Sequence, residues 1–334
     1  MNPAMPRYIF PWLLSGAIAF AMWDGGRDMR ILTRQIKASQ TVEELSACLR
    51  EAVSNPSFNE IHVSAAYHRL ALLGKKGALK QGTVLARLGQ RLRQLLLEGR
   101  MDPQGCANTI WALPKVVAVV PPDVVGLLAD VGAKKVRLMK PQELSNCMWA
   151  SSKLKNVTPE ILRMVPALAA EIPLKAGGMI PQHLSNCMWA AAHLKDVAPE
   201  ALGTLPALVA RIPEAHEMIP QHLSNCLWAA AQLKDVAPEV LIMVPAIAQR
   251  IPSKVKELKP QELSNCLWAC AQLKDVVPDV RRIVPALAAQ VPKRAAHMTQ
   301  QGLANCLWAA TQLKDAAPDV IGLVPAVAHR VRPS

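Results

Sequence analysis

Aromatic residues other than tryptophan are scarce in this 334-residue sequence, and so are the motifs from which catalytic sites are built. It has two Tyr and three Phe, against eight Trp. It lacks a glycine-rich phosphate-binding loop and a pair of carboxylates outside the repeated positions. It also has no sequence pattern typical of a Ser/His/Asp catalytic triad. His62 and His68 lie in an apolar stretch and are more typical of core or surface positions than of ligands. We therefore expect no enzyme, no small-molecule substrate and no cofactor, unless the first hundred residues hide a catalytic module.

Charge of one sign is not concentrated in any segment. The sequence has no run of five or six like charges, which excludes a basic arm or an acidic tail. The formal net charge is nevertheless +13 and the isoelectric point is about 9.6. This distributed basic excess favours polyanionic partners such as nucleic acid or anionic lipid, and carries no information on the fold.

The eight cysteines form no CxxC motif and no Cys/His cluster with metal-ligand spacing, so we expect no metal site. Five of them recur at intervals of 39 or 40 residues: Cys147, Cys187, Cys226, Cys266 and Cys306. In stacked repeats, equivalent Cα atoms lie one repeat spacing apart, beyond the limit of about 7 Å for a disulfide. We interpret these cysteines as reduced, buried small hydrophobes in a non-oxidising compartment.

A repeat of about 40 residues runs through most of the chain. Its positions are marked by tryptophans at intervals of 38 to 40 residues: Trp111, Trp149, Trp189, Trp228, Trp268 and Trp308. One unit reads "PQELSNCMWASSKLKNVTPEILRMVPALAAEIPLKAGGMI" (141–180), with later copies from Pro181, Pro220, Pro260 and Gln300 and a degenerate copy from Pro103. Such a period indicates a stack of supersecondary units, each burying its apolar face against its neighbours.

Each unit predicts two helices. An apolar stripe at helical spacing follows a proline in the first turn, and "NVTPE" restarts the chain with Pro159 at the start of the second helix. Pro166 lies inside that second helix, so we expect it to be kinked or split, and Pro173 to end it. The sequence predicts an all-α protein, an α-solenoid of about 38–40-residue helix-turn-helix repeats, with the first helices lining one surface.

Four segments follow from this pattern. Residues 141–334 hold five regular repeats, 103–140 a degenerate repeat and 41–102 diverged helical repeats. Residues 1–40 form a hydrophobic and basic segment that suits targeting. Its apolar run "YIFPWLLSGAIAFAMW" (Tyr8–Trp23) resembles a signal or membrane-anchor core, with a basic stretch after it that suits an organelle transit segment. A buried helix and an incorrect first exon are the alternatives.

Asparagine recurs in the middle of the first helix, where it is a poor helix former. The positions are Asn146, Asn186, Asn225, Asn265 and Asn305, with Asn108 in the degenerate copy. They point away from the core within each repeat. The side chains either form a buried ladder between repeats or point into a groove, where an amide can bind a base edge or a peptide backbone.

A lysine ends each first helix: Lys155, Lys195, Lys234, Lys274 and Lys314. A single lysine here complements the helix dipole on a solvated face, whereas a regular row is also what a phosphate backbone needs. An Asp follows four of the five and partly offsets their field.

Positions that vary between units could carry specificity, although neutral drift at exposed sites produces the same pattern. The third residue of the unit is Glu143, His183, His222, Glu262 or Gly302, and one position of the second helix holds Arg163 and Arg282. Residues just before the Leu-Lys pair also vary: Lys153, His193, Gln232, Gln272 and Gln312. We interpret Trp149, Trp189, Trp228, Trp268 and Trp308 as structural contacts between repeats. The alternative is a platform on which bases stack, worth about 1–3 kcal/mol per base.

The unit can be written as P-Q-x-L-S-N-x-L-W-A-x-A-x-L. In this form it resembles the octotricopeptide-type helical repeats of organellar RNA-binding proteins. Those repeats share a Trp-Ala phrase with FAST-kinase-like and RAP-domain proteins, and their relatives include helical-repeat subunits of RNA-editing substrate-binding complexes. The resemblance spans residues 55–334 and is strongest from Pro141. It implies an α-superhelix that binds single-stranded RNA in a mitochondrion or plastid, alongside other RNA-processing proteins, in transcript processing, stability or editing. Two features depart from it: the Pro-Pro-Pro-Glu-Trp phrase is missing, and Pro166 interrupts the second helix.

A protein-interaction solenoid of armadillo-like type is the alternative function. Armadillo-type repeats also use Asn and Trp to hold extended peptides, but with the pair four residues apart, whereas Asn precedes Trp by three here. The net charge of +13 favours RNA over a peptide.

Overall fold

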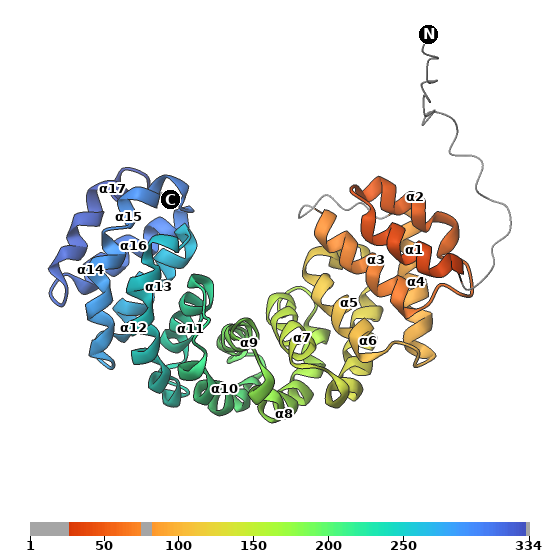
Figure 1. Ribbon diagram of the computed structural model, residues 1–334, viewed down its shortest axis with the longest axis horizontal. Helices are drawn as coiled ribbons and strands as arrows, with labels where there is room; N and C mark the ends of the chain where they lie inside the picture. The colour runs from red at the N-terminus through yellow and green to blue at the C-terminus, as the bar shows by residue number, and fades with distance from the viewer. Residues whose placement is uncertain (1–26, 75–81, 332–334) are drawn as a thin grey trace, which may run out of the picture.

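In the computed structural model, which describes residues 27–74 and 82–331, every regular element is a helix. The helices form two rows along an open arc, and the inner row lines its concave side (Figure 1). Successive inner helices pack against one another. The inner row consists of α3 (Glu60–Leu73), α5 (Pro103–Val116), α7 (Pro141–Leu154), α9 (Pro181–Leu194), α11 (Pro220–Leu233), α13 (Pro260–Leu273) and α16 (Gln300–Leu313). The predicted all-α solenoid is confirmed.

The outer row carries the second helix of each repeat. It consists of α4 (Thr83–Leu97), α6 (Pro122–Lys135), α8 (Val165–Lys175), α10 (Leu205–Arg211), α12 (Val244–Lys254), α14 (Val284–Ala288) with α15 (Val291–Arg294), and α17 (Val324–Ala328). From residue 159 onward, a six-residue 3-10 segment leads into each of these helices: η3 (Pro159–Met164), η5 (Pro199–Thr204), η7 (Pro238–Met243), η9 (Pro278–Ile283) and η11 (Pro318–Leu323). Shorter 3-10 segments are η1 (Val117–Val119), η2 (Val136–Leu138), η4 (Ala176–Gly178), η6 (Ile212–Glu214), η8 (Val255–Glu257) and η10 (Ala295–His297).

The repeated prolines explain this division of the second helix. Pro166 lies in the first turn of α8, where its missing N–H would have no helical partner, so the predicted split of the helix is confirmed. The expectation that the next proline ends the helix is wrong in three repeats. In one of them, Pro292 lies in the first turn of α15. α8 continues past Pro173 to Lys175, and α12 continues past Pro252 to Lys254. In both helices this proline lies in the last turn. The helix therefore continues for only two residues beyond it before the following 3-10 segment begins.

The array begins earlier than the sequence indicated. α1 (Arg27–Ala38) packs against α3 and buries Leu32 and Ile36, and α2 (Val42–Ala52) follows it. Residues 27–38 fall within the segment 1–40 predicted to suit targeting, and their apolar residues at a spacing of four form the buried face of this helix. The apolar run Tyr8–Trp23 lies outside the described residues. Within residues 27–74 and 82–331, no helix is long and apolar enough to cross a membrane.

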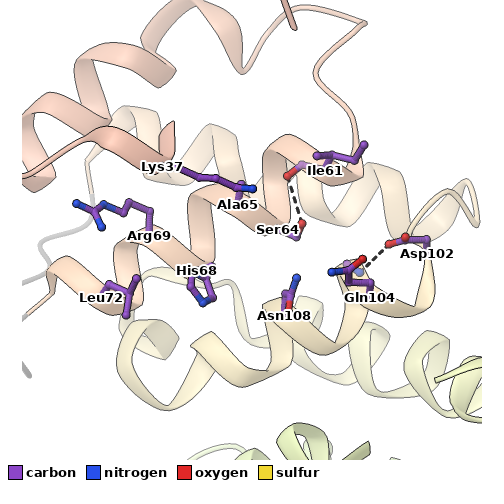
Figure 2. A pocket seen from close by; sticks show the side chains of 11 residues that line it. Lys37, Ile61, Ser64, Ala65, His68, Arg69, Leu72, Asp102, Gln104 and Asn108 are labelled. Atoms are coloured by element: carbon purple, nitrogen blue, oxygen red, sulfur yellow. Dashed lines mark hydrogen bonds between the residues drawn. The ribbon is translucent and has the colours of Figure 1, made fainter. Parts of the chain in front are cut away.

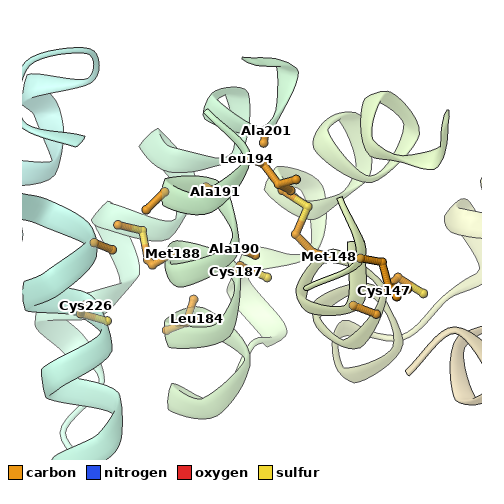
Figure 3. Close-up of a cluster of buried hydrophobic side chains, with 14 of the residues drawn as sticks. Cys147, Met148, Leu184, Cys187, Met188, Ala190, Ala191, Leu194, Ala201 and Cys226 are labelled. Atoms are coloured by element: carbon orange, nitrogen blue, oxygen red, sulfur yellow. The ribbon is translucent and has the colours of Figure 1, made fainter. Parts of the chain in front are cut away.

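The core is continuous from repeat to repeat. Figure 3 shows a section of it, in which Cys147, Cys187 and Cys226 lie among Leu, Met and Ala side chains of successive inner helices. The five repeated cysteines are fully buried, as their apolar setting predicts. Burial raises the pKa of the Cys187 and Cys226 thiols to about 12, because the thiolate would lose its hydration. These thiols are inert packing groups.

Candidate functional site

Each helix of the inner row from α5 onward presents one partly exposed polar stripe to the concave side. In α11 the stripe is Gln221, Asn225, Trp228 and Gln232, at spacings of four, three and four residues, which keep side chains on one helix face. The opposite face of α11 is buried against α12 and the neighbouring repeats. We call these four positions the Gln-Asn-Trp-X stripe, where X is the fourth position and varies between helices.

Six consecutive inner helices carry this stripe, and its first three positions do not vary. The glutamines are Gln104, Gln142, Gln182, Gln221, Gln261 and Gln301, and the asparagines are Asn108, Asn146, Asn186, Asn225, Asn265 and Asn305. The fourth positions are Lys115, Lys153, His193, Gln232, Gln272 and Gln312. The concave face is therefore rich in amides, basic towards the N-terminal end and neutral towards the C-terminal end.

The asparagines are half-exposed, and within the described part of the chain none of their side-chain amides has a hydrogen-bond partner. A buried ladder between repeats would require such partners. The link between repeats at α11 is instead made by the preceding residue, Ser224, which is fully buried and donates through Oγ to the carbonyl of Glu262 at 3.1 Å. Of the two alternatives, the geometry matches side chains that face the groove.

The exposed glutamines of the stripe were not singled out in the sequence. Their side-chain amides also have no partner among residues 27–74 and 82–331. A signal for them was present, since each lies four residues before the asparagine and seven before the tryptophan. Each repeat thus offers two invariant amides beside a tryptophan, which can donate and accept at once.

The tryptophans lie where repeats meet and form a row along the concave face. Ring centroids are 6.3 Å apart for Trp189–Trp228, 6.4 Å for Trp228–Trp268 and 6.2 Å for Trp268–Trp308. Each ring is half-covered by its neighbours, except that Trp308 is 38% exposed. The position between repeats is the one that the helical spacing predicts.

Two fourth-position residues, Lys153 and His193, lie between neighbouring rings. The Lys153 ammonium lies 4.1 Å from the Trp189 ring centroid and 5.9 Å from that of Trp149, a cation–π bridge between two repeats. His193 lies between Trp189 and Trp228, with centroid distances of 3.6 and 4.7 Å. Burial lowers the pKa of His193, and the nearby Lys153 and Lys155 charges add to this, while a hydrogen bond to the Trp189 carbonyl opposes it. The ring is therefore neutral at physiological pH.

The lysine row does not present a set of free charges. Lys155 donates to the carbonyl of His193 in the next repeat, and Lys195 donates to that of Gln232 at 2.9 Å. Lys234 and Lys274 form ion pairs with Asp235 and Asp275 at 2.8 and 2.7 Å. Lys314 is exposed at the end of the array. The first two lysines hold helix ends of adjacent repeats together, because ammonium groups bind carbonyls left free in the last helical turn.

Three of the third-position residues, Glu143, His222 and Glu262, cap their own helices. A carboxylate oxygen of Glu143 accepts from the Lys140 backbone N–H at 2.9 Å, and His222 Nδ1 lies 3.4 Å from the Ile219 nitrogen. His183 is half-buried, and its Nδ1 atom is buried without a partner among the described residues. Burial lowers the pKa of both histidines. His222 therefore caps its own helix, whereas His183 is a half-buried packing residue.

The two arginines predicted to bind RNA lie on the outer row. Arg163 in η3 pairs with Asp130 at 3.3 Å, and Arg282 in η9 pairs with Asp279 at 3.4 Å. Both are exposed, and η3 and η9 pack against the outer-row helices α6 and α12. The structure brings the five asparagines onto one surface, but it places these arginines elsewhere.

Comparison with known proteins gives no family for this chain. No protein-family model matches it, and no curated protein matches its sequence.

Proposed function

We propose that this protein is a single-stranded RNA-binding scaffold that holds the strand along its concave face and acts in organellar RNA processing, stability or editing. The observation that carries the proposal is the Gln-Asn-Trp-X stripe, repeated on six inner helices, whose Asn and Gln side-chain amides have no hydrogen-bond partner among the described residues. Helical-repeat RNA binders read one base per repeat with two or three side chains. Each unit here supplies up to three polar side chains beside a tryptophan.

A single strand fits this face better than a duplex. Base edges are accessible only in unpaired RNA, and the deep major groove of an A-form duplex hides them from side chains. The amides can pair with those edges, while Lys115 and Lys153 hold phosphates at the N-terminal end of the face. The net charge of +13 supports a polyanionic ligand.

The fourth position is the one that can distinguish bases, because it alone varies within the stripe. Gln232, Gln272 and Gln312 are identical, so three adjacent repeats should prefer the same base. His193 occupies the same position with a different side chain and should prefer a different base. A selected RNA motif is therefore expected to contain a run of three identical nucleotides at one end.

An armadillo-like protein-interaction scaffold is the second candidate. It is favoured by the neutral C-terminal half of the face, where the stripe carries no cation and the lysines Lys234 and Lys274 are paired with aspartates. An extended peptide backbone could bind the same amides.

The test is equilibrium binding of the full chain to a random single-stranded RNA pool at two salt concentrations, with duplex RNA as control. We expect salt-sensitive binding of the single strands and enrichment of a short motif. Lys115→Gln with Lys153→Gln should reduce the slope of log K against log salt by about 1.4, since each phosphate contact on a single strand contributes about 0.7.

The matched control is Lys134→Gln with Lys293→Gln, two exposed lysines on α6 and α15 of the outer row. This variant loses the same charge but should keep the slope. No binding at low salt would refute the proposal and leave the peptide scaffold as the function to test. Equal loss of slope in both variants would show that the concave face is not the binding surface.

A further inference from the structure

A cavity of about 580 Å³ lies at the N-terminal end of the concave face, between α1, α3 and α5. Figure 2 shows its lining: Lys37 reaches in from α1, His68 and Arg69 belong to α3, and Gln104 and Asn108 belong to the first stripe. Its volume is within the range of about 300–1,000 Å³ typical of small-ligand sites.

Two cations without a carboxylate partner, Lys37 and Arg69, line this cavity, and a third, Lys115, lies beside it over the Trp111 ring that stacks on His68. Among the described residues, Lys37, Arg69 and Lys115 form no salt bridge. Arg69 donates through Nε to the Ser39 carbonyl at 2.5 Å, which leaves its terminal nitrogens without a partner. Lys115 lies over the Trp111 ring, 5.2 Å from its centroid. Asp102 also lines the cavity, but its carboxylate accepts from the Gly105 N–H at 2.6 Å as a helix cap.

The pKa of His68 responds to the positive charges around the cavity. Its ring stacks on Trp111 with a centroid distance of 4.8 Å. Burial lowers its pKa, and the positive charges of Lys37, Lys115 and Arg69 lower it further. All three positive charges therefore lie close enough to His68 to affect its pKa. A bound anion would offset the repulsion between these charges.

The amide ladder ends at this cavity. On α3, the positions that correspond to Gln, Asn, Trp and X are Ile61, Ala65, His68 and Leu72, and Ile61 and Leu72 are exposed apolar residues. A strand that continued past α5 would meet no amide at the corresponding positions of α3. The end of a bound strand is therefore expected here.

We infer that this cavity binds the terminal phosphate of the RNA strand whose following nucleotides lie along the Gln-Asn-Trp-X stripe, an inference that rests on the proposed function. A terminal phosphomonoester carries a charge of about −1.5 to −2 at neutral pH, more than a diester within the chain, and so matches three unpaired cations better. Gln104 and Asn108 are placed to contact the terminal nucleotide beside it.

The experiment compares one short RNA sequence with a 5′-phosphate, with a 3′-phosphate, and with hydroxyls at both ends, bound to the full chain and followed by fluorescence anisotropy. One phosphorylated form should bind about tenfold more tightly than the hydroxyl form, the size of one charge-assisted hydrogen bond. Lys37→Gln should remove most of that preference. Arg34→Gln, an exposed position on the same helix outside the cavity lining, should retain it.

The possible failures are distinguishable. Equal affinity for all three ends, with binding intact, would overturn the terminal-phosphate site and leave the proposed function standing. No binding of any form would overturn the proposed function itself. A nucleoside monophosphate that binds as tightly as the phosphorylated strand would also overturn the inference, because it would show a site for free nucleotides. Thermal melting of both variants checks that each is folded.

Discussion

Replacing Asn225 with alanine should weaken RNA binding without weakening the fold. Asn225 lies in the middle of α11, half-exposed, and its side chain has no hydrogen-bond partner in the described structure. Alanine is the better helix former by roughly 0.5 kcal/mol, so the free energy of unfolding should rise slightly or stay unchanged. An amide that pairs with a base edge contributes about 1–2 kcal/mol, so affinity should fall by roughly tenfold.

The adjacent residue provides a control with the opposite expectation. Ser224 is fully buried, and its hydroxyl donates to the Glu262 carbonyl of the next repeat at 3.1 Å. Ser224→Ala gains a similar helix propensity but loses this hydrogen bond, whose net contribution is about 1 kcal/mol. Because the propensity gain is common to both variants, Ser224→Ala should be less stable than Asn225→Ala by about 1 kcal/mol. Its RNA affinity should remain that of the unmodified chain.

The assay pairs urea unfolding, followed by circular dichroism, with anisotropy of a labelled single-stranded RNA. Both measurements use the full chain at one salt concentration, since affinities depend strongly on salt. A large loss of stability in Asn225→Ala would refute the reasoning, because it would show that the asparagine ties repeats together. Unchanged affinity with unchanged stability would remove Asn225 from the binding surface.

Three further outcomes follow from the structure. Trp228→Ala should destabilise the protein by about 3 kcal/mol and Trp308→Ala by clearly less, because Trp228 contacts rings on both sides and Trp308 on one; equal losses in urea unfolding would contradict this. Alkylation of the native protein at pH 8 should modify half-buried Cys48 first, since the seven other thiols are buried; peptide mapping that finds uniform labelling would contradict it. The urea midpoint should fall as the pH drops from about 7 to 5, and fall less in His193→Gln. A histidine whose folded pKa lies below its unfolded value of about 6.5 stabilises the fold above that pH and loses this effect as the unfolded chain takes up protons. A midpoint independent of pH would show that His193 is not held neutral.

The period and the proline positions were enough to predict the solenoid. A tryptophan every 38 to 40 residues requires equivalent units, and Pro166 cannot lie within an uninterrupted helix, so the split second helix was predictable as well. The helical angle also placed Asn225 away from the core of its own repeat. Whether it then faced a neighbour or the groove depends on how repeats stack, which the sequence of one unit does not specify.

The lysines show why part of the site could not be predicted. Lys195 reaches the carbonyl of Gln232, and this acceptor exists only because the next helix ends beside it in the stack. The role of the third-position residues was more accessible. Glu143 stands three residues after Lys140, the spacing at which a glutamate accepts from the backbone N–H that precedes a helix. The sequence alone could therefore have predicted a capping role for this third position, which was instead considered as a determinant of RNA specificity.

The most direct test of the concave RNA surface is ultraviolet cross-linking of the full chain to single-stranded RNA, with the linked peptides mapped by mass spectrometry. Binding along the Gln-Asn-Trp-X stripe predicts cross-links in peptides from α7, α9, α11 and α13, and their loss when unlabelled RNA competes. Cross-links confined to the outer row, around Arg163 and Arg282, would contradict it.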